Sequence, residues 1–352
     1  MQRIKIVNIR FKIFLLLSLF LLLGEISCSR FSGNVYPLPS VYHTWQEVKT
    51  EMDSLAVLHP DTVTLIKLGT TVQARNDISV LRIRKKEGTV PVLIVGQHHG
   101  DEVMGVEIAL DFAQFLVKPS ANASDLLERY TFWIVPTLNP DALEIVTSGL
   151  YEWKRKNNTD SNNNGKLDLK TDGVDLNRNY PVFWESDVSV VPSEQYYKGP
   201  YPASEHEVQA LIDLAEKVRF QYAFFYHSSV SGRFNETVYL PWFDPQNKAD
   251  KADFASMRKL AHLYAENVPK DYEPGTYSVF SGNSSQVGNA RNYFYHTWGT
   301  SCLTIEVCGV NKFGRGIEHP KAAQRKTIVE KNRKALASTL IQQTLFDKNK
   351  EY

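Results

Sequence analysis

The feature that most constrains the fold is an alternation of short apolar runs with segments whose apolar residues recur at helical spacing. Residues 90–95 (Val-Pro-Val-Leu-Ile-Val) are nearly all apolar, which is typical of a strand buried on both faces in the middle of a sheet. Two capping boxes, at Thr44 and Ser204, predict the starts of two helices. Other strands are predicted at 63–68, 78–84, 130–135, 222–226 and 301–307, and other helices at 103–117, 252–268 and 321–346. We therefore expect one α/β domain, with a central mixed, mostly parallel twisted sheet flanked by helices on both faces.

Composition excludes several classes of protein. The 352 residues are 43% hydrophobic, which excludes a disordered chain. Lys and Arg (40) balance Asp and Glu (39), so no positive excess exists to bind nucleic acid. Three cysteines are too few for a disulfide scaffold.

The first 27 residues have the pattern of an export signal. Basic residues precede the apolar run 13–23, and eleven helical residues rise only about half the thickness of a bilayer core. Residues 1–27 are therefore predicted to be a signal peptide, followed by a short segment at 28–41. The protein is expected to be exported: secreted, periplasmic or lipid-anchored. Cys28, at the predicted cleavage site, leaves a lipoprotein signal open, and a lipid there would be the one expected membrane contact.

Two histidines come at or shortly after the ends of apolar strands. His99 follows residues 90–95 and has Glu102 three residues later, while His227 ends the run 222–226. Because such strand ends meet at one edge of a parallel sheet, these side chains can converge, and two His with one Glu is a known catalytic zinc set. Taken alone, His-x-x-Glu also arises by chance, and a strand-end His is often a structural hydrogen-bonding residue.

Glu306 interrupts an otherwise apolar strand, and Thr304 shares its face at a period of two. A carboxylate there is costly unless it is paired or has a function. A salt bridge at the strand end and a general base beside an activated water both account for it.

Residues 145–200 form a long polar stretch without sustained periodicity, which is more often functional than a linker. It contains Trp-Lys-Arg-Lys-Asn at 153–157 and Val-Asp-Leu-Asn-Arg-Asn-Tyr at 174–180. Arg and Asn side chains supply N–H donors suited to a carboxylate, although a solvated basic turn also accounts for each segment alone.

Taken together, these segments resemble the zinc metallocarboxypeptidase family typified by carboxypeptidase A. The motifs occur in the family's order: His-x-x-Glu, an Asn-Pro-Asp turn at 139–141, Arg-Lys-Asn at 155–157, the 174–180 motif, the strand-end His and the Glu in an apolar strand. The resemblance implies the zinc carboxypeptidase fold, a catalytic domain at 42–347 and an enzyme that acts on the C-termini of peptides and proteins.

The resemblance also implies the roles of individual residues. Glu306 would be the general base that takes a proton from the attacking water and returns it to the leaving amine. Arg155 would stabilise the oxyanion; Lys154 also follows Trp153, but the Arg-Lys-Asn match favours Arg155. The remaining assignments are Asn177 and Arg178 for the substrate carboxylate and His99, Glu102 and His227 for one Zn²⁺ per chain.

At two positions the chain departs from the family's pattern. The family's substrate-contacting tyrosine has no clear counterpart, and Tyr277 is the nearest candidate. Fifteen residues before Glu306, where the family lines its side-chain pocket, this chain has Arg291. An Arg there would favour acidic C-terminal residues by charge complementarity.

A loop rich in Asn and Asp suggests a second metal. Oxygen-bearing side chains alternate before Gly165, as in the first half of a calcium loop, but Thr171 stands where such loops carry a bidentate Glu. A metal-free turn held by these side chains is the alternative. The candidate Ca²⁺ ligands are Asp160, Asn162, Asn164 and Asp168.

Two other functions stay open at this stage. The same zinc site could serve an amidase or peptidase that acts on cell-wall peptides. A carboxypeptidase-like protein that binds peptides without catalysis is an interpretation of a different class. Zinc content together with chelator-sensitive release of C-terminal residues distinguishes catalysis from binding alone.

Overall fold

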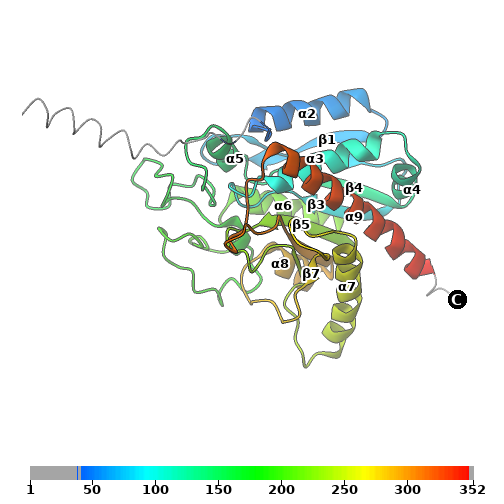
Figure 1. The fold of residues 1–352 in the computed structure, drawn as a ribbon. Coiled ribbons are helices and arrows are strands. Elements are labelled where there is room, and N and C mark those ends of the chain that lie inside the picture. Colours follow the sequence, from blue (N-terminus) through cyan, green and yellow to red (C-terminus); the bar gives the residue numbers. More distant parts are fainter. Residues whose placement is uncertain (1–37, 39–40, 349–352) are drawn as a thin grey trace, which may run out of the picture. The chain divides into compact units, whose positions relative to one another are not determined.

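An eight-stranded mixed sheet forms the centre of the computed structural model, which describes Leu38 and residues 41–348 (Figure 1). Its strand order is β1-β2-β4-β3-β5-β8-β6-β7. The middle strands β4, β3, β5 and β8 pair in parallel, while β1, β2 and β6 make the antiparallel pairings. The strands are β1 (Val63–Thr70), β2 (Asp77–Ile83), β3 (Val90–Val95), β4 (Tyr130–Val135), β5 (Tyr222–Ser228), β6 (Thr237–Tyr239), β7 (Ser278–Val279) and β8 (Ser301–Val307).

All six predicted strands are confirmed, and the short strands β6 and β7 were not predicted. Helices α4, α5 and α8 were also not predicted from the spacing of apolar residues. None of the helices in the described part of the chain is long and apolar enough to cross a membrane. The helices are α2 (Trp45–Leu58), α3 (Met104–Val117), α4 (Ala121–Arg129), α5 (Pro140–Thr147), α6 (His206–Val218), α7 (Lys248–Glu266), α8 (Ala290–Trp298) and α9 (Ala322–Lys348).

One of the two predicted capping boxes forms. The Thr44 side chain accepts the backbone N–H of Glu47, whose side chain accepts the N–H of Thr44, so α2 begins as predicted. The box at Ser204 is wrong: α6 has no side-chain cap. The Ser204 hydroxyl instead donates to the Glu205 carboxylate (2.6 Å) and accepts from Asn179 (2.9 Å). These side-chain contacts link the start of α6 to the 174–180 motif.

The alternation of side chains along β5 confirms that helices cover both faces of the sheet. Phe224 packs against Tyr264 of α7, and the hydroxyl of Tyr226 lies 3.2 Å from that of Tyr264. Phe225, which points the other way, packs against Phe294 of α8. Every residue of β5 is buried, as expected for a central strand.

The carboxyl ends of β3, β5 and β8 meet at one edge of the sheet, next to the irregular polar stretch. Of the stretch predicted to be irregular (145–200), residues 145–147 belong to α5. Apart from a short 3-10 helix at Leu176–Arg178 (η1), residues 148–205 form turns and loops. The predicted signal peptide at 1–27 and Cys28 lie outside the described residues, as does the 28–41 segment except for Leu38 and Val41.

Candidate active site

His99 and Glu102 lie in a tight turn between β3 and α3. The backbone N–H of Glu102 donates to the carbonyl of His99 (3.2 Å), so the two side chains share one side of the turn. The helix predicted at 103–117 follows directly as α3, which begins at Met104. Gly100 makes the turn possible: a Cβ there would lie 2.4 Å from the Lys154 carbonyl oxygen. Its N–H donates to the Arg155 carbonyl (3.0 Å), which links the turn to the segment carrying Arg155.

The structure brings the three predicted zinc ligands together. Ligand atoms of His99, Glu102 and His227 all lie within 4.8 Å of one another, and no other His, Cys, Asp or Glu group among the described residues does this. The Nδ1 atom of His99 is 2.7 Å from Glu102 Oε1, and that of His227 is 2.8 Å from Glu102 Oε2.

This donor set fits a zinc ion. The Nδ1 atoms of His99 and His227 lie 3.2 Å apart, and two neutral imidazole lone pairs that face each other repel unless a cation or proton lies between them. Two imidazole nitrogens and one carboxylate are the protein ligands of an open catalytic zinc site. All three side chains are buried, so little water competes for them.

Asp175 holds the predicted ligand His99 in position, a contact that the sequence analysis missed. Nε2 of His99 donates to Asp175 Oδ1 (3.0 Å), which leaves Nδ1 as the nitrogen available to a metal. Arg155 donates to Asp175 Oδ2 through Nε (3.1 Å) and Nη2 (3.0 Å). Burial alone would raise the pKa of Asp175, but Arg155 and His99 hold it well below its usual range. The only sequence signal was its place in the 174–180 motif.

Glu306 faces the same cavity as the three ligands. In the parallel pairing of β5 with β8 it stands beside His227, and both line a cavity of about 900 Å³. Burial, followed by the nearby Glu102 carboxylate, raises the pKa of Glu306 to about 8. Its Oε2 atom is buried without a hydrogen-bond partner. The sequence left open a salt bridge of Glu306 at the strand end. Among the described residues, Glu306 forms no ion pair.

Three predicted substrate-binding and oxyanion residues line this cavity: Arg155, Asn177 and Arg178. Asn177 accepts the N–H of Ala290 through its side chain (3.0 Å), which ties η1 to α8. Arg178 donates to the Asn177 carbonyl (2.9 Å). The neighbouring Lys154 is buried and donates to the carbonyl of Asp172 (2.8 Å) instead. The geometry therefore favours Arg155 over Lys154 as the cation that borders this cavity.

Arg291, at the start of α8, also lines the cavity. It donates through Nη1 to Thr304 (3.1 Å), while its buried Nε has no partner. Burial, followed by the nearby Arg178, lowers the pKa of Arg291 to about 10. A buried guanidinium with an unused N–H calls for an acceptor from a ligand.

Tyr277 is not brought to the cavity. Its side chain is only 4% exposed, and its ring faces the Lys331 ammonium at 5.0 Å. Its backbone N–H donates to the Val268 carbonyl (2.9 Å), and it is not among the residues that line the cavity. Two other tyrosines line the cavity, Tyr196 and Tyr239. The ring of Tyr196 lies 5.1 Å from the Arg155 guanidinium and 5.4 Å from that of Arg178, an arrangement the sequence analysis missed.

The calcium loop is not supported. The Asp160 carboxylate accepts backbone N–H groups of Asn164 (3.2 Å) and Gly165 (2.7 Å), and Asp168 accepts those of Lys170 and Thr171. These oxygens are used within the loop, and the amides of the predicted ligands Asn162 and Asn164 also make turn contacts. The metal-free alternative, a turn held by Asn and Asp side chains, matches the structure.

Comparison with known proteins agrees with this geometry. A family model described as zinc carboxypeptidase matches residues 48–333. Carboxypeptidase B of Astacus astacus is 28% identical over 174 residues, which cover 49% of this chain and 55% of that protein. Carboxypeptidase B2 of Rattus norvegicus is 23% identical over 283 residues, or 78% and 64% of the two chains. The chain thus spans about half the length of several curated relatives that it matches.

Solved structures share the fold. Bovine thrombin-activatable fibrinolysis inhibitor, in complex with tick carboxypeptidase inhibitor, matches with a TM-score of 0.70 and 20% identity, over 86% of this chain and 97% of that chain. Carboxypeptidase A from Helicoverpa armigera matches with a TM-score of 0.71 and 19% identity, over 86% and 73%. With the family model spanning the site and most of the described chain, the protein belongs to the zinc carboxypeptidase family.

Proposed function

We propose that the protein is an exported, zinc-dependent carboxypeptidase that hydrolyses the C-terminal peptide bond of peptides and proteins and prefers an acidic last residue. One observation carries the proposal: His99, Glu102 and His227 converge within 4.8 Å in a cavity that also contains Glu306 and Arg178. A metal site, a carboxylate and a carboxylate-binding arginine are the parts that such a hydrolysis requires.

Each residue of the site has a chemical task in this proposal. A zinc ion held by His99, Glu102 and His227 supplies Lewis-acid activation of water and of the peptide carbonyl. Glu306 accepts the water proton on its carboxylate and passes it to the leaving amine. Arg155 has five N–H groups, three of which serve Glu102 and Asp175. The remaining two are available to the developing oxyanion.

The free end of the substrate is recognised by positive charge. Arg178 and Asn177 border the cavity where the terminal carboxylate would lie. Arg291 adds a second guanidinium besides that of Arg178, and its Nε–H has no hydrogen-bond partner. Because a C-terminal Glu or Asp carries two carboxylates, it matches two guanidinium groups better than an apolar or basic residue does.

The test compares peptides that differ only in the last residue: Glu, Phe or Lys. With zinc-loaded protein we expect kcat/KM for Glu to exceed the others by about tenfold or more, as for one charge-assisted contact. Arg291→Gln should remove this preference, whereas Arg233→Gln, which removes an exposed charge at the same cavity, should keep it. Faster release of Phe or Lys contradicts the acidic preference. No chelator-sensitive release from any peptide contradicts the carboxypeptidase activity itself and favours a binding protein.

A further inference from the structure

A second cavity, of about 440 Å³, adjoins the catalytic one. Arg155, Gln195 and Val230 line both cavities, so the two share a wall. Asn177 and Arg178 line only the catalytic cavity. A peptide whose C-terminal carboxylate is held there and whose last bond lies at Arg155 would therefore extend its upstream residues toward the second cavity.

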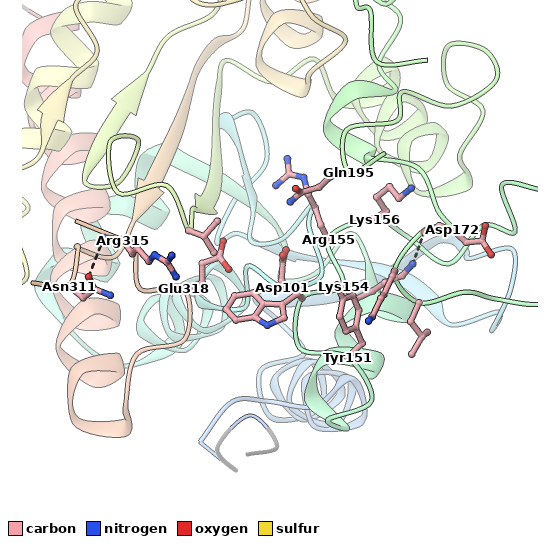
Figure 2. Close-up of a pocket in the computed structure, with 15 residues that line it drawn as sticks. Asp101, Tyr151, Lys154, Arg155, Lys156, Asp172, Gln195, Asn311, Arg315 and Glu318 are labelled. Atoms are coloured by element: carbon pink, nitrogen blue, oxygen red, sulfur yellow. Dashed lines mark hydrogen bonds between the residues drawn. The ribbon is translucent and has the colours of Figure 1, made fainter. Parts of the chain in front are cut away.

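Two buried carboxylates in this second cavity have unmatched oxygen atoms. Asp101 and Glu318 are 5% and 6% exposed, and Asp101 Oδ1 and Glu318 Oε2 have no hydrogen-bond partner. Figure 2 shows both side chains pointing into the middle of the cavity. Because buried polar atoms are nearly always hydrogen-bonded, these two oxygens call for a donor that the chain does not supply.

The cations around this cavity are engaged elsewhere or exposed. Lys154 donates to the Asp172 carbonyl (2.8 Å), and Lys156 donates to the carbonyls of Thr171 (2.6 Å) and Pro192 (2.7 Å). Arg155 is held by Glu102 and Asp175. The other cations of the lining, Lys170 and Arg315, are exposed. The two carboxylates inside the cavity therefore each lack a hydrogen-bond donor for one oxygen.

The backbone holds both carboxylates in place. Glu318 lies on the segment after β8, where Gly316 donates to the Val230 carbonyl (3.0 Å) and Ser231 forms a bridge with Arg315. His319 Nε2 donates to the Asp101 carbonyl (2.8 Å). Burial, followed by the carboxylates of Asp101 and Glu102, raises the pKa of Glu318 to about 10, and Arg155 and the backbone of Val230 oppose this shift only in part.

The occupant that fits is a singly charged N–H donor. Asp101 and Glu318 belong to no group of three metal-ligating side chains among the residues described, so a divalent cation lacks ligands. We propose that this cavity is a subsite in which Asp101 and Glu318 bind the ammonium or guanidinium group of a substrate residue upstream of the scissile bond. Such charge-assisted bonds are the strong class of hydrogen bond. The proposal rests on the carboxypeptidase function proposed above.

The test uses acetylated peptides that end in Glu and carry Lys or norleucine at one of the three positions before the scissile bond. We expect one position at which Lys raises kcat/KM about tenfold over norleucine, the value of one such contact. Glu318→Gln should bring this ratio close to one by lowering kcat/KM for the Lys peptide. Glu216→Gln, which removes an exposed carboxylate on α6, is the matched control and should keep the ratio.

A binding measurement makes the test independent of turnover. In Glu306→Gln protein, the Lys peptide should bind about tenfold more tightly than the norleucine peptide, and adding Glu318→Gln should remove the difference. Free and acetylated tripeptides show whether an N-terminal ammonium can replace the side chain. A ratio near one at all three positions, or one unaffected by Glu318→Gln, overturns the subsite. Because norleucine peptides are still hydrolysed in that case, the carboxypeptidase proposal would survive it.

Discussion

Two regions of the protein contain several side chains of the kinds that bind metal ions, but they differ in where the ligand atoms point. In the candidate zinc site, Nδ1 of His99 and of His227 and both oxygens of Glu102 converge on one another. In the loop at 160–172, Asp160 and Asp168 direct their oxygens at backbone N–H groups of the loop itself. The difference shows that ligand spacing in a sequence is not enough. Ligand atoms bind a metal only where the backbone has not already used them.

The largest expected effect comes from removing one zinc ligand. His227→Ala should lower bound zinc from about one ion per chain to nearly none and abolish peptide hydrolysis, because two protein ligands seldom retain catalytic zinc. Metal analysis of the purified variant measures this directly. Asp168→Ala, the matching change in the other segment, should keep both zinc and activity. Full zinc occupancy in the His227 variant would contradict the assigned site.

The next effect separates proton transfer from metal binding. Glu306→Gln should lower kcat by about 10²–10⁴-fold, because the amide cannot accept a proton from water. Zinc content should not change, since Glu306 lies outside the group of ligands. Steady-state kinetics with parallel metal analysis checks both parts. A variant that retains normal kcat would exclude Glu306 as the base.

A smaller effect is expected when two buried aspartates are compared, one beside the candidate zinc ligands and one in the loop at 160–172. Asp175→Asn should weaken zinc binding roughly 10–100-fold, because it removes the acceptor that orients His99. Asp172→Asn should leave zinc affinity unchanged and lower only the melting temperature, since its oxygens accept from Ser161, Asn162 and the Asp168 N–H. Competition with a chelator measures the affinities. Equal zinc affinities in the two variants would contradict this assignment of roles.

The smallest effect concerns the loop alone. Asp160→Ala removes a side chain that accepts two backbone N–H groups, so unfolding should become easier by roughly 1 kcal/mol. Adding calcium to zinc-replete wild-type protein should not move its melting temperature. Thermal unfolding with and without calcium tests this. A midpoint that rises with calcium would restore the calcium site that the hydrogen bonds argue against.

Much of the fold and site followed from local pattern. The apolar runs predicted the strands that carry the site. The period of two along β8 correctly placed Thr304 and Glu306 on the same face of that strand, which borders the cavity. The second capping box failed because the Ser204 hydroxyl bonds instead to Asn179 of the 174–180 motif and to the neighbouring Glu205. A competing contact of this kind depends on residues distant in sequence, which local pattern does not register.

The sequence by itself pointed to the candidate site residues, because strand ends follow from local pattern and the order of the motifs can be read along the chain. Only the tertiary structure decided which atoms remain free: Asp175 holds His99 across 76 positions, and Tyr277 is buried while Tyr196 lies between two arginines. It also left one carboxylate oxygen each of Asp101 and Glu318 without a hydrogen-bond donor. The physical reason is that a polar atom's availability depends on every group packed around it, and packing brings together parts of the chain that lie far apart in sequence.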